Sequence, residues 1–139
     1  MKRPLHCKTF RIGRSRTGLG LFATAPIEKG ALIVEYTGRR IPTRLAQERE
    51  ARGSRYMFEI NSRWTIDGSG RRNVARYLNH ACRPNAEAET VRGRIMIRAI
   101  KSIRPGDEIT YDYGRDYFEL FFRQTGCKCG TCLRRRHKP

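Results

Sequence analysis

Glycine and proline divide this chain into short segments, and that division limits the folds open to it. The 139 residues include 13 glycines and 6 prolines, and only 38% of the residues are hydrophobic. The apolar residues fall in short bursts rich in β-branched and aromatic side chains, which is typical of short strands. No apolar run reaches the roughly 18 residues that a membrane-crossing helix needs. A chain of this length holds one ordinary hydrophobic core, so we predict a single soluble domain that is mostly β.

The expected elements follow from this punctuation. Pro42 begins the run P-T-R-L-A-Q-E-R-E-A-R and Gly53 follows it, which is the order of residues expected around a helix. Arg92-Gly93 separates two apolar runs and predicts a hairpin, and R-P-G-D at 104–107 predicts a turn. The expected strands are residues 9–13, 19–23, 31–36, 56–60, 64–67, 86–91, 94–100 and 108–113, and a short aromatic helix is expected over 117–123.

The segment from Gly18 to Ala23 (G-L-G-L-F-A) satisfies the letter pattern G-x-G-x-x-A of a dinucleotide-binding loop. Such a loop must open a helix that crosses between two parallel strands. Pro26 and Gly30 lie where that helix would run, and a helix interior tolerates neither of them well. The context therefore excludes the dinucleotide loop and favours a strand.

The formal net charge is +17, from 30 Lys and Arg residues against 13 Asp and Glu, and it is spread along the whole chain. A surface of this charge attracts polyanions, nucleic acids above all, through the release of counterions. An Arg-rich surface that is simply solvated gives the same composition. Charge alone therefore does not define the function.

Five cysteines are present, at positions 7, 82, 127, 129 and 132. An odd number without a secretion signal argues against a disulfide framework, so we expect reduced thiols and an intracellular protein. Cys127-x-Cys129-x-x-Cys132 places three soft ligands within six residues, which suits zinc and its preference for four ligands. The spacing leaves the fourth ligand open between Cys82, Cys7 and a histidine.

Two further segments concentrate polar and aromatic side chains. N-H-A-C-R-P-N at 79–85 places an amide, an imidazole and a thiol in a non-repetitive stretch, although turn chemistry alone would explain it. E-I-T-Y-D-Y-G at 108–114 carries Tyr111 and Tyr113 on the same face of the expected strand, where a packed aromatic face is the simpler explanation. Each segment is modest evidence by itself.

In their chain order, these segments resemble the SET-domain protein-lysine methyltransferases. The resemblance covers about residues 8–133, and N-H-x-C-x-P-N and E-x-T-Y-D-Y are its most specific parts. The shorter matching segments are Gly18–Gly20, Glu35–Gly38, Tyr56–Phe58, Ile66–Gly68 and Asn73–Leu78.

The resemblance implies a β-rich α+β fold of several small sheets, with a knot-like threading of the chain near residues 79–85 and 113. It divides the chain into an N-terminal extension (1–7), a SET domain (8–123) and a zinc-binding segment like those that follow SET domains, with a basic tail (124–139). A chain of these parts looks like a free-standing, minimal SET domain, similar to bacterial or viral members of the family as much as to chromatin enzymes.

The resemblance also implies S-adenosylmethionine as methyl donor, and zinc. Tyr113 matches the catalytic tyrosine, and Tyr36, Tyr56 and Tyr111 match positions around the channel for the substrate lysine. The cofactor-binding positions are Gly18, Leu19, Gly20, Arg76, Tyr77, Asn79, His80 and Tyr113, and the zinc ligands are Cys82, Cys127, Cys129 and Cys132. Two departures stand out, because Ala81 replaces the usual serine and the last cysteine gap has two residues where the family has four.

The residue chemistry suits this reaction independently of the resemblance. Methyl transfer from a sulfonium is an in-line displacement, which requires alignment, a dry channel and a neutral amine. Tyrosine rings exclude water and pack along a lysine stem, while their hydroxyls orient the amine. The family has Phe or Tyr at the position of Tyr111, and Tyr leaves less room for further methyl groups. We therefore expect mainly monomethylation, with dimethylation second.

The expected substrate is a histone tail or another basic, nucleic-acid-associated protein, with nucleic acid as a further partner of the basic surface and no membrane partner. A strongly positive enzyme repels a lysine-rich substrate unless acidic residues line its groove. The acidic candidates are Glu59, Glu87 and Glu89. The expected location is chromatin in a eukaryotic cell or the cytoplasm or nucleoid of a bacterium, and the small size and Arg-rich composition favour a bacterium.

Two other functions stay open on the sequence. A basic zinc-containing module that binds DNA or RNA would explain the charge and the Arg134–Arg136 tail, but not the tyrosines or the Asn79-His80 pair. A pseudoenzyme with the SET fold would bind the cofactor or a protein without turnover. Against it, every matched active-site position carries a competent residue.

Overall fold

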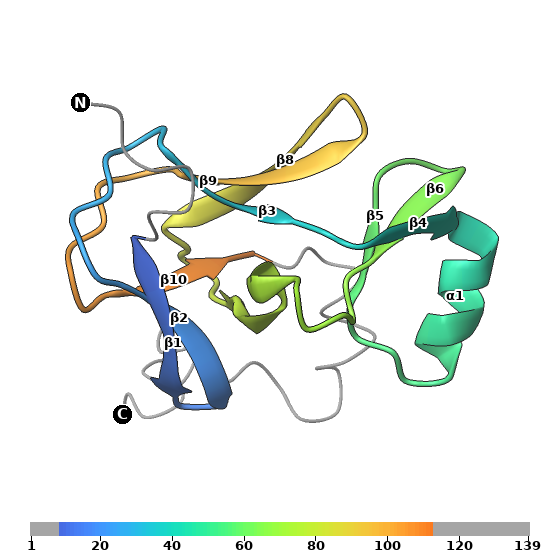
Figure 1. Ribbon diagram of the computed structural model, residues 1–139, viewed down its shortest axis with the longest axis horizontal. Coiled ribbons are helices and arrows are strands. Elements are labelled where there is room, and N and C mark those ends of the chain that lie inside the picture. Colours follow the sequence, from blue (N-terminus) through green and yellow to red (C-terminus); the bar gives the residue numbers. More distant parts are fainter. Residues whose placement is uncertain (1–8, 113–139) are drawn as a thin grey trace, which may run out of the picture. The chain divides into compact units, whose positions relative to one another are not determined.

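The computed structural model describes residues 9–112, and within them it contains ten strands, one α-helix and one 3₁₀ turn (Figure 1). The strands form three small sheets, which confirms the predicted β-rich α+β fold. The described residues divide into two compact units, a first unit of 9–31, 77–87 and 99–112 and a second unit of 32–76 and 88–98. The elements are β1 (Phe10–Ser15), β2 (Gly18–Ala23), β3 (Leu32–Tyr36), β4 (Arg39–Pro42), α1 (Thr43–Ala51), β5 (Met57–Glu59), β6 (Trp64–Asp67), the 3₁₀ turn η1 (Val74–Tyr77), β7 (Asn79–His80), β8 (Ala86–Val91), β9 (Arg94–Ala99) and β10 (Glu108–Tyr111).

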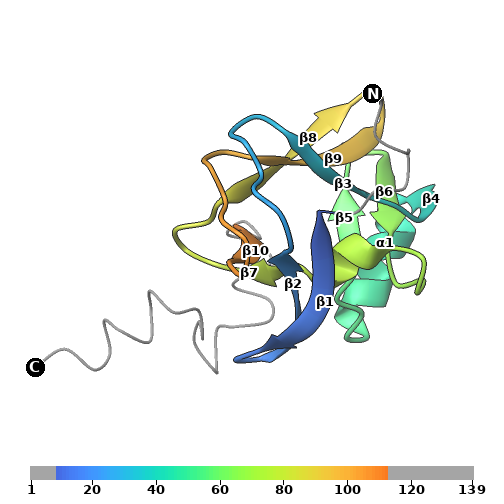
Figure 2. The same ribbon diagram turned by 60° about the vertical axis from the view of Figure 1, so that its left-hand side comes forward.

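The first unit is built on a four-stranded sheet in the order β1-β2-β10-β7 (Figure 2). β1 and β2 form an antiparallel hairpin, and β10 runs antiparallel to β2 on its other side. Leu21 of β2 pairs with Ile109 of β10, and both side chains are fully buried. β7 pairs with β10 in parallel, with Asn79 opposite Thr110 and His80 opposite Tyr111. One sheet thus holds the Gly-Leu-Gly, Asn-His and Glu-Ile-Thr-Tyr segments.

In the second unit, α1 lies against the three-stranded sheet β4-β6-β5 (Figure 1). Ile41, Ala46 and Met57 form a small buried cluster at this contact. The helix starts after Pro42, whose φ of −57° already suits a helix, and it ends before Gly53, whose φ is +99°. The predicted helix is therefore confirmed, with proline and glycine in the expected places.

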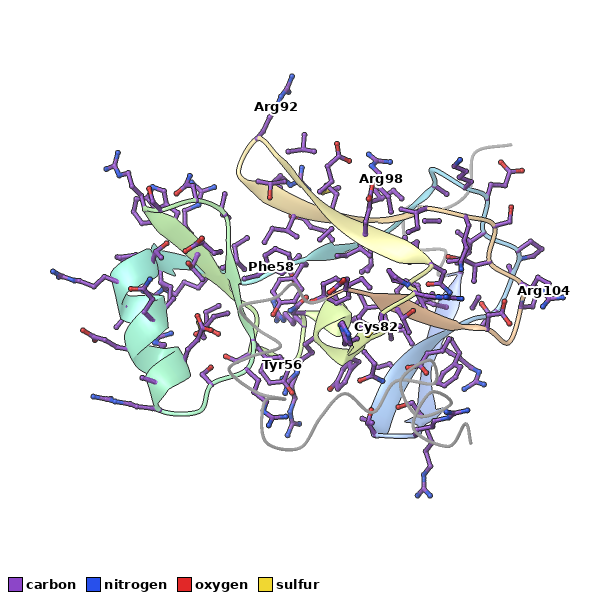
Figure 3. All side chains as sticks on the ribbon, turned by 180° about the vertical axis from the view of Figure 1, so that it is seen from behind. Tyr56, Phe58, Cys82, Arg92, Arg98 and Arg104 are labelled. Carbon is purple, nitrogen blue, oxygen red and sulfur yellow. The ribbon has the colours of Figure 1, made fainter. Side chains whose placement is uncertain are left out.

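The third sheet has the order β3-β9-β8, and its hairpin turn is the predicted Arg92-Gly93 pair. Both turn residues have positive φ, 51° and 76°, as a tight two-residue hairpin turn requires. The Arg92 side chain projects from this tip (Figure 3). Ile95 and Ile97 of β9 are fully buried, so alternate residues of this strand form the core face.

The sequence-based expectations differ from the structure mainly in the shortest elements. β4, η1 and β7 were not predicted, because each has only two to four residues and depends on partners distant in the chain. The turn at 104–107 is confirmed by a hydrogen bond from Asp107 N to Arg104 O of 3.0 Å. β10 ends at Tyr111 within the described residues, and the predicted helix at 117–123 and the knot-like threading at Tyr113 involve residues outside them.

The chain after β2 does not form the helix that a dinucleotide loop requires. Ile27 instead makes an antiparallel bridge with Ile103, and Gly30 N donates to Ala99 O at 2.8 Å. The exclusion of that loop is therefore confirmed. In residues 9–112 there is also no helix long and apolar enough to cross a membrane.

Candidate active site

Asn79 is the centre of a hydrogen-bond network in the first unit. Its Nδ2 lies 2.9 Å from Ser15 Oγ, 2.9 Å from Leu19 O and 2.8 Å from Glu108 Oε2. These partners come from β1, β2 and β10, so one amide side chain from β7 joins all four strands of the sheet. We call these four residues the Asn79 network.

Gly20 makes room for the Asn79 network. A Cβ on Gly20 would stand 2.5 Å from Glu108 Oε2 and 3.0 Å from Asn79 Nδ2, closer than side-chain carbons approach. The glycine at this position is therefore required by packing within the protein. The resemblance had implied only that it lines the cofactor pocket.

Gly18 differs from Gly20 in both conformation and surroundings. Its φ is +130°, a region that residues with a side chain rarely adopt. Among the described residues, no atom lies within 4 Å of the place where a Cβ would stand. The backbone at Gly18 can therefore be approached closely by a bound group, which fits a cofactor site.

His80 follows Asn79 and lies between two polar partners. Its Nε2 is 3.4 Å from Cys82 Sγ and its Nδ1 is 3.6 Å from Asp112 Oδ1. The imidazole is only 6% exposed, and this burial lowers the pKa of His80, although the Asp112 carboxylate acts in the opposite direction. The ring is therefore mostly neutral at pH 7.

Asn85 fixes the end of the N-H-A-C-R-P-N segment to β10. Its Nδ2 donates to Glu108 O at 2.8 Å, and its Oδ1 accepts from Thr110 N at 2.9 Å. The side-chain amide of Asn85 thus makes one donor and one acceptor bond to β10, as the backbone of a neighbouring strand would. Nearby on β10, Tyr111 is buried, with 8% of its surface exposed.

A second cluster, in the second unit, contains two of the predicted channel tyrosines. The Tyr36 hydroxyl donates to Tyr56 O at 2.8 Å, and the Tyr36 ring centroid lies 5.2 Å from that of Phe58. The Arg76 guanidinium stacks over the Tyr56 ring, 4.3 Å from its centroid, and also donates to Ser69 O. Figure 3 labels Tyr56, which directly precedes β5, and Phe58, which lies within it. Tyr36, Tyr56 and Arg76 therefore form one aromatic and cationic cluster.

Asn73 packs next to the second cluster, and the sequence analysis gave it no functional role. Its side chain is buried, with Oδ1 accepting from Thr37 N and Nδ2 donating to Gly68 O, both at 3.0 Å. A Cβ on Gly68 would collide with Asn73 and with the Tyr36 ring. Gly68 and Asn73 both lie in segments that match the family, but the resemblance gave neither of them a role, because their contact depends on the fold.

The acidic residues expected near a substrate differ in their surroundings. Glu89 pairs with Arg98, with 3.1 Å between Oε2 and Nε, so its charge is largely balanced. Burial raises the pKa of Glu50, and the negative charge of Glu59 raises it further. Glu87 is exposed on β8. Glu59 and Glu87, which are both exposed, are therefore stronger candidates for attracting a positively charged substrate than Glu89, which is paired with Arg98.

The predicted site residues divide between the two units and the part of the chain that follows residue 112. Within residues 9–112, no group of three or more His, Cys, Asp or Glu side chains is arranged to hold a metal ion. The one predicted zinc ligand in this range, Cys82, is exposed. The first unit contains Gly18, Leu19, Gly20, Tyr77, Asn79, His80, Cys82 and Tyr111, and the second contains Tyr36, Tyr56 and Arg76. Tyr113, Cys127, Cys129 and Cys132 lie outside the described residues.

The chain matches the family model described as the SET domain over residues 18–114. It belongs to the SET-domain family. This SET domain begins its match at Gly18, the first residue of β2, and the match includes both the Asn79-His80 pair and the Glu108–Tyr111 strand. The three clustered cysteines follow the matched range.

Curated relatives of this SET domain carry the names of histone methyltransferases. It is 40% identical over 138 residues to Histone-lysine N-methyltransferase set-2 of Caenorhabditis elegans, covering 90% of this chain and 9% of the relative. It is 40% identical over 131 residues to Histone-lysine N-methyltransferase 2D of Homo sapiens, covering 86% of this chain and 2% of the relative. The chain thus spans less than a tenth of the length of these two relatives.

Two solved structures contain chains with the same fold as this one. The crystal structure of the Chaetomium thermophilum polycomb repressive complex 2 contains a chain that superposes with a TM-score of 0.72 and 32% identity, over 82% of this chain and 16% of that chain. The structure of the same complex with H3K27me3 and H3K27M gives a TM-score of 0.71 and 32% identity, over 78% and 15% of the two chains.

Proposed function

We propose that this SET domain transfers a methyl group from S-adenosylmethionine to the side-chain amine of a lysine in a protein. The pairing of β7 with β10 carries the proposal, because it places the two most specific segments of the resemblance side by side, Asn79-His80 against Thr110-Tyr111. The relatives named as histone-lysine N-methyltransferases support the same activity. A histone is accordingly the proposed substrate, and chromatin the proposed location.

The cofactor, when bound, supplies a methyl group on a positively charged sulfonium. On our proposal, the open backbone at Gly18 and the amide of Asn79 hold it, with Leu19, Gly20 and His80 beside them. His80 suits this position because its imidazole is buried directly after Asn79 in β7. Arg76, Tyr77 and Tyr113 complete the proposed set of cofactor-binding residues.

The tyrosines are proposed to orient the substrate lysine and to exclude water from it. Tyr56 carries the Arg76 guanidinium on its ring, so an amine brought to that ring meets a positive charge. Such a charge lowers the pKa of a lysine from its usual value of about 10.4 and favours the neutral, nucleophilic form. The Tyr36 hydroxyl already donates to Tyr56 O, so Tyr36 acts by holding Tyr56. Tyr113 is the proposed catalytic tyrosine.

Calorimetric titration of the full chain with S-adenosylmethionine tests the cofactor assignment. We expect binding of S-adenosylmethionine and no binding of NAD, because β2 is a strand and residues 24–31 after it form no helix to receive a pyrophosphate. Binding of NAD in place of the methyl donor would contradict the assignment. A basic nucleic-acid-binding module would bind neither S-adenosylmethionine nor NAD, and that function would not explain the Asn79 network.

Tyr111 is proposed to limit the number of methyl groups transferred. It is buried in β10, where its hydroxyl takes up space that a more methylated amine would need. We expect Tyr111→Phe to shift the product from monomethyl-lysine towards dimethyl- and trimethyl-lysine, measured by mass spectrometry of a histone peptide. An unchanged product distribution in an active Tyr111→Phe variant would contradict this role.

We further propose that residues 8–123 form the SET domain and that residues 124–139 form a zinc-binding segment, with Cys82, Cys127, Cys129 and Cys132 as ligands. Four thiolates suit the tetrahedral site that zinc prefers. We expect about one zinc ion per chain, lost in Cys82→Ser and retained in Cys7→Ser, as measured by elemental analysis of the purified protein. Loss in Cys7→Ser instead would assign the fourth position to Cys7.

A further inference from the structure

Glu108 contacts the predicted cofactor-binding asparagine but was assigned no role from the sequence. Its Oε2 lies 2.8 Å from Asn79 Nδ2. The backbone of Glu108 is itself held on two sides, because β10 pairs it with Phe22 of β2 and Asn85 Nδ2 donates to its carbonyl at 2.8 Å. The carboxylate therefore starts from a fixed point in the sheet.

The partners of Asn79 determine which way its amide faces. A carboxylate and a backbone carbonyl can only accept hydrogen bonds, so the atom that contacts both Glu108 Oε2 and Leu19 O must be the amide nitrogen. The two N–H groups of that nitrogen are used by these two acceptors, with the Ser15 hydroxyl as a third neighbour 2.9 Å away. If the amide turned over, its oxygen would meet two acceptors and lose both bonds.

We propose that Glu108 is a positioning residue for the methyl-donor site, which fixes the Asn79 amide so that Oδ1 faces away from the network and accepts a hydrogen bond from the cofactor. This inference rests on the proposed function. A hydrogen bond to a charged group is stronger than one between neutral groups, so the carboxylate holds this orientation better than a neutral side chain would. Because the acceptor is already oriented before binding, less of the binding free energy is lost in ordering the Asn79 side chain.

Gly20 contributes to the same positioning of Asn79. Its missing side chain leaves the space that the Glu108 carboxylate and the Asn79 amide occupy. The first glycine of the Gly-Leu-Gly segment leaves the backbone open, while the second admits the groups that orient Asn79. The two glycines therefore serve one site in different ways.

The test is a double-mutant cycle between Glu108 and Asn79 in the full chain. Glu108→Gln keeps the shape but loses the charge, and we expect it to raise the dissociation constant for S-adenosylmethionine by about five- to tenfold. In an Asn79→Ala background the same substitution should have no further effect, because Glu108 acts through Asn79. The rate at saturating cofactor should stay unchanged in Glu108→Gln. Glu28→Gln, an exposed carboxylate of the same unit, is the matched control.

The outcomes separate this inference from the proposed function. An equal loss of affinity from Glu108→Gln in both backgrounds would overturn the positioning role and leave the cofactor assignment standing. If the wild-type chain does not bind S-adenosylmethionine, the proposed function fails. The side-chain amide resonances of Asn79 in ¹⁵N-labelled protein then decide the orientation, which is supported if Glu108→Gln shifts them and Glu28→Gln does not, and overturned if Glu108→Gln leaves them unmoved.

Discussion

Replacement of Tyr113 by phenylalanine is expected to lower methyl transfer by about 100-fold, the effect typical of losing one well-placed catalytic group. Phenylalanine keeps the ring that packs along the lysine stem and removes only the hydroxyl proposed to orient the amine and the methyl group. The loss should therefore appear in the maximal rate more than in the affinity for substrate. Transfer of labelled methyl groups to histone proteins, followed at saturating cofactor, measures it.

Tyr117→Phe provides the matched control, because it removes the hydroxyl of a tyrosine four residues away to which no role is assigned. This control should keep nearly full activity. Full activity in Tyr113→Phe would contradict the catalytic assignment even if the chain proves to be a methyltransferase. Equal losses in both variants would indicate a general loss of structure.

Substitution of Gly20 by alanine is expected to weaken binding of the methyl donor by more than about tenfold and to destabilise the fold by about 1–3 kcal/mol, the range found for overpacked sites. The new methyl group would stand 2.5 Å from Glu108 Oε2, 3.0 Å from Asn79 Nδ2 and 3.2 Å from Ser15 Cβ. Glu108 and Asn79 would have to separate, so the same change should disturb both the sheet and the orientation of Asn79. Thermal unfolding and calorimetric titration measure the two effects.

Gly70→Ala is the control for this prediction. Gly70 has an ordinary φ, and among the described residues no atom stands within 4 Å of its hypothetical Cβ. Alanine there should leave cofactor binding unchanged and should change stability by less than about 1 kcal/mol. Tight cofactor binding and unchanged stability in Gly20→Ala would mean that the Asn79 network does not form as described.

Much of the fold could be predicted from local residue chemistry. Pro42 and Gly53 bracket α1 because both act on the backbone at their own positions. Arg92-Gly93 predicted its hairpin because a two-residue turn demands positive φ. Pro26 and Gly30 excluded a helix after β2 for equally local reasons. Each of these predictions needed only neighbours in the chain, and each is confirmed.

The parts that sequence reasoning missed depend on contacts between distant residues. β7 has two residues and exists as a strand because β10 pairs with it. Glu108 and Asn79 are 29 positions apart, and their side chains meet only after the sheet has formed. The resemblance implied that Asn79 is a cofactor-binding position without indicating what orients it. The contact of the Tyr36 hydroxyl with Tyr56 O joins residues 20 positions apart, and a place for Tyr36 beside the lysine stays a prediction.

Lysine methylation by this SET domain can be measured in a single assay. The full chain is incubated with S-adenosylmethionine and a mixture of histones, and the histones are then examined by mass spectrometry for methylated lysines. We expect methyl groups on lysine side chains, mainly one per lysine, and about 100-fold less methylation when Tyr113→Phe replaces the wild-type protein. A chain that binds S-adenosylmethionine but adds no methyl group to any lysine would contradict the account and identify a pseudoenzyme.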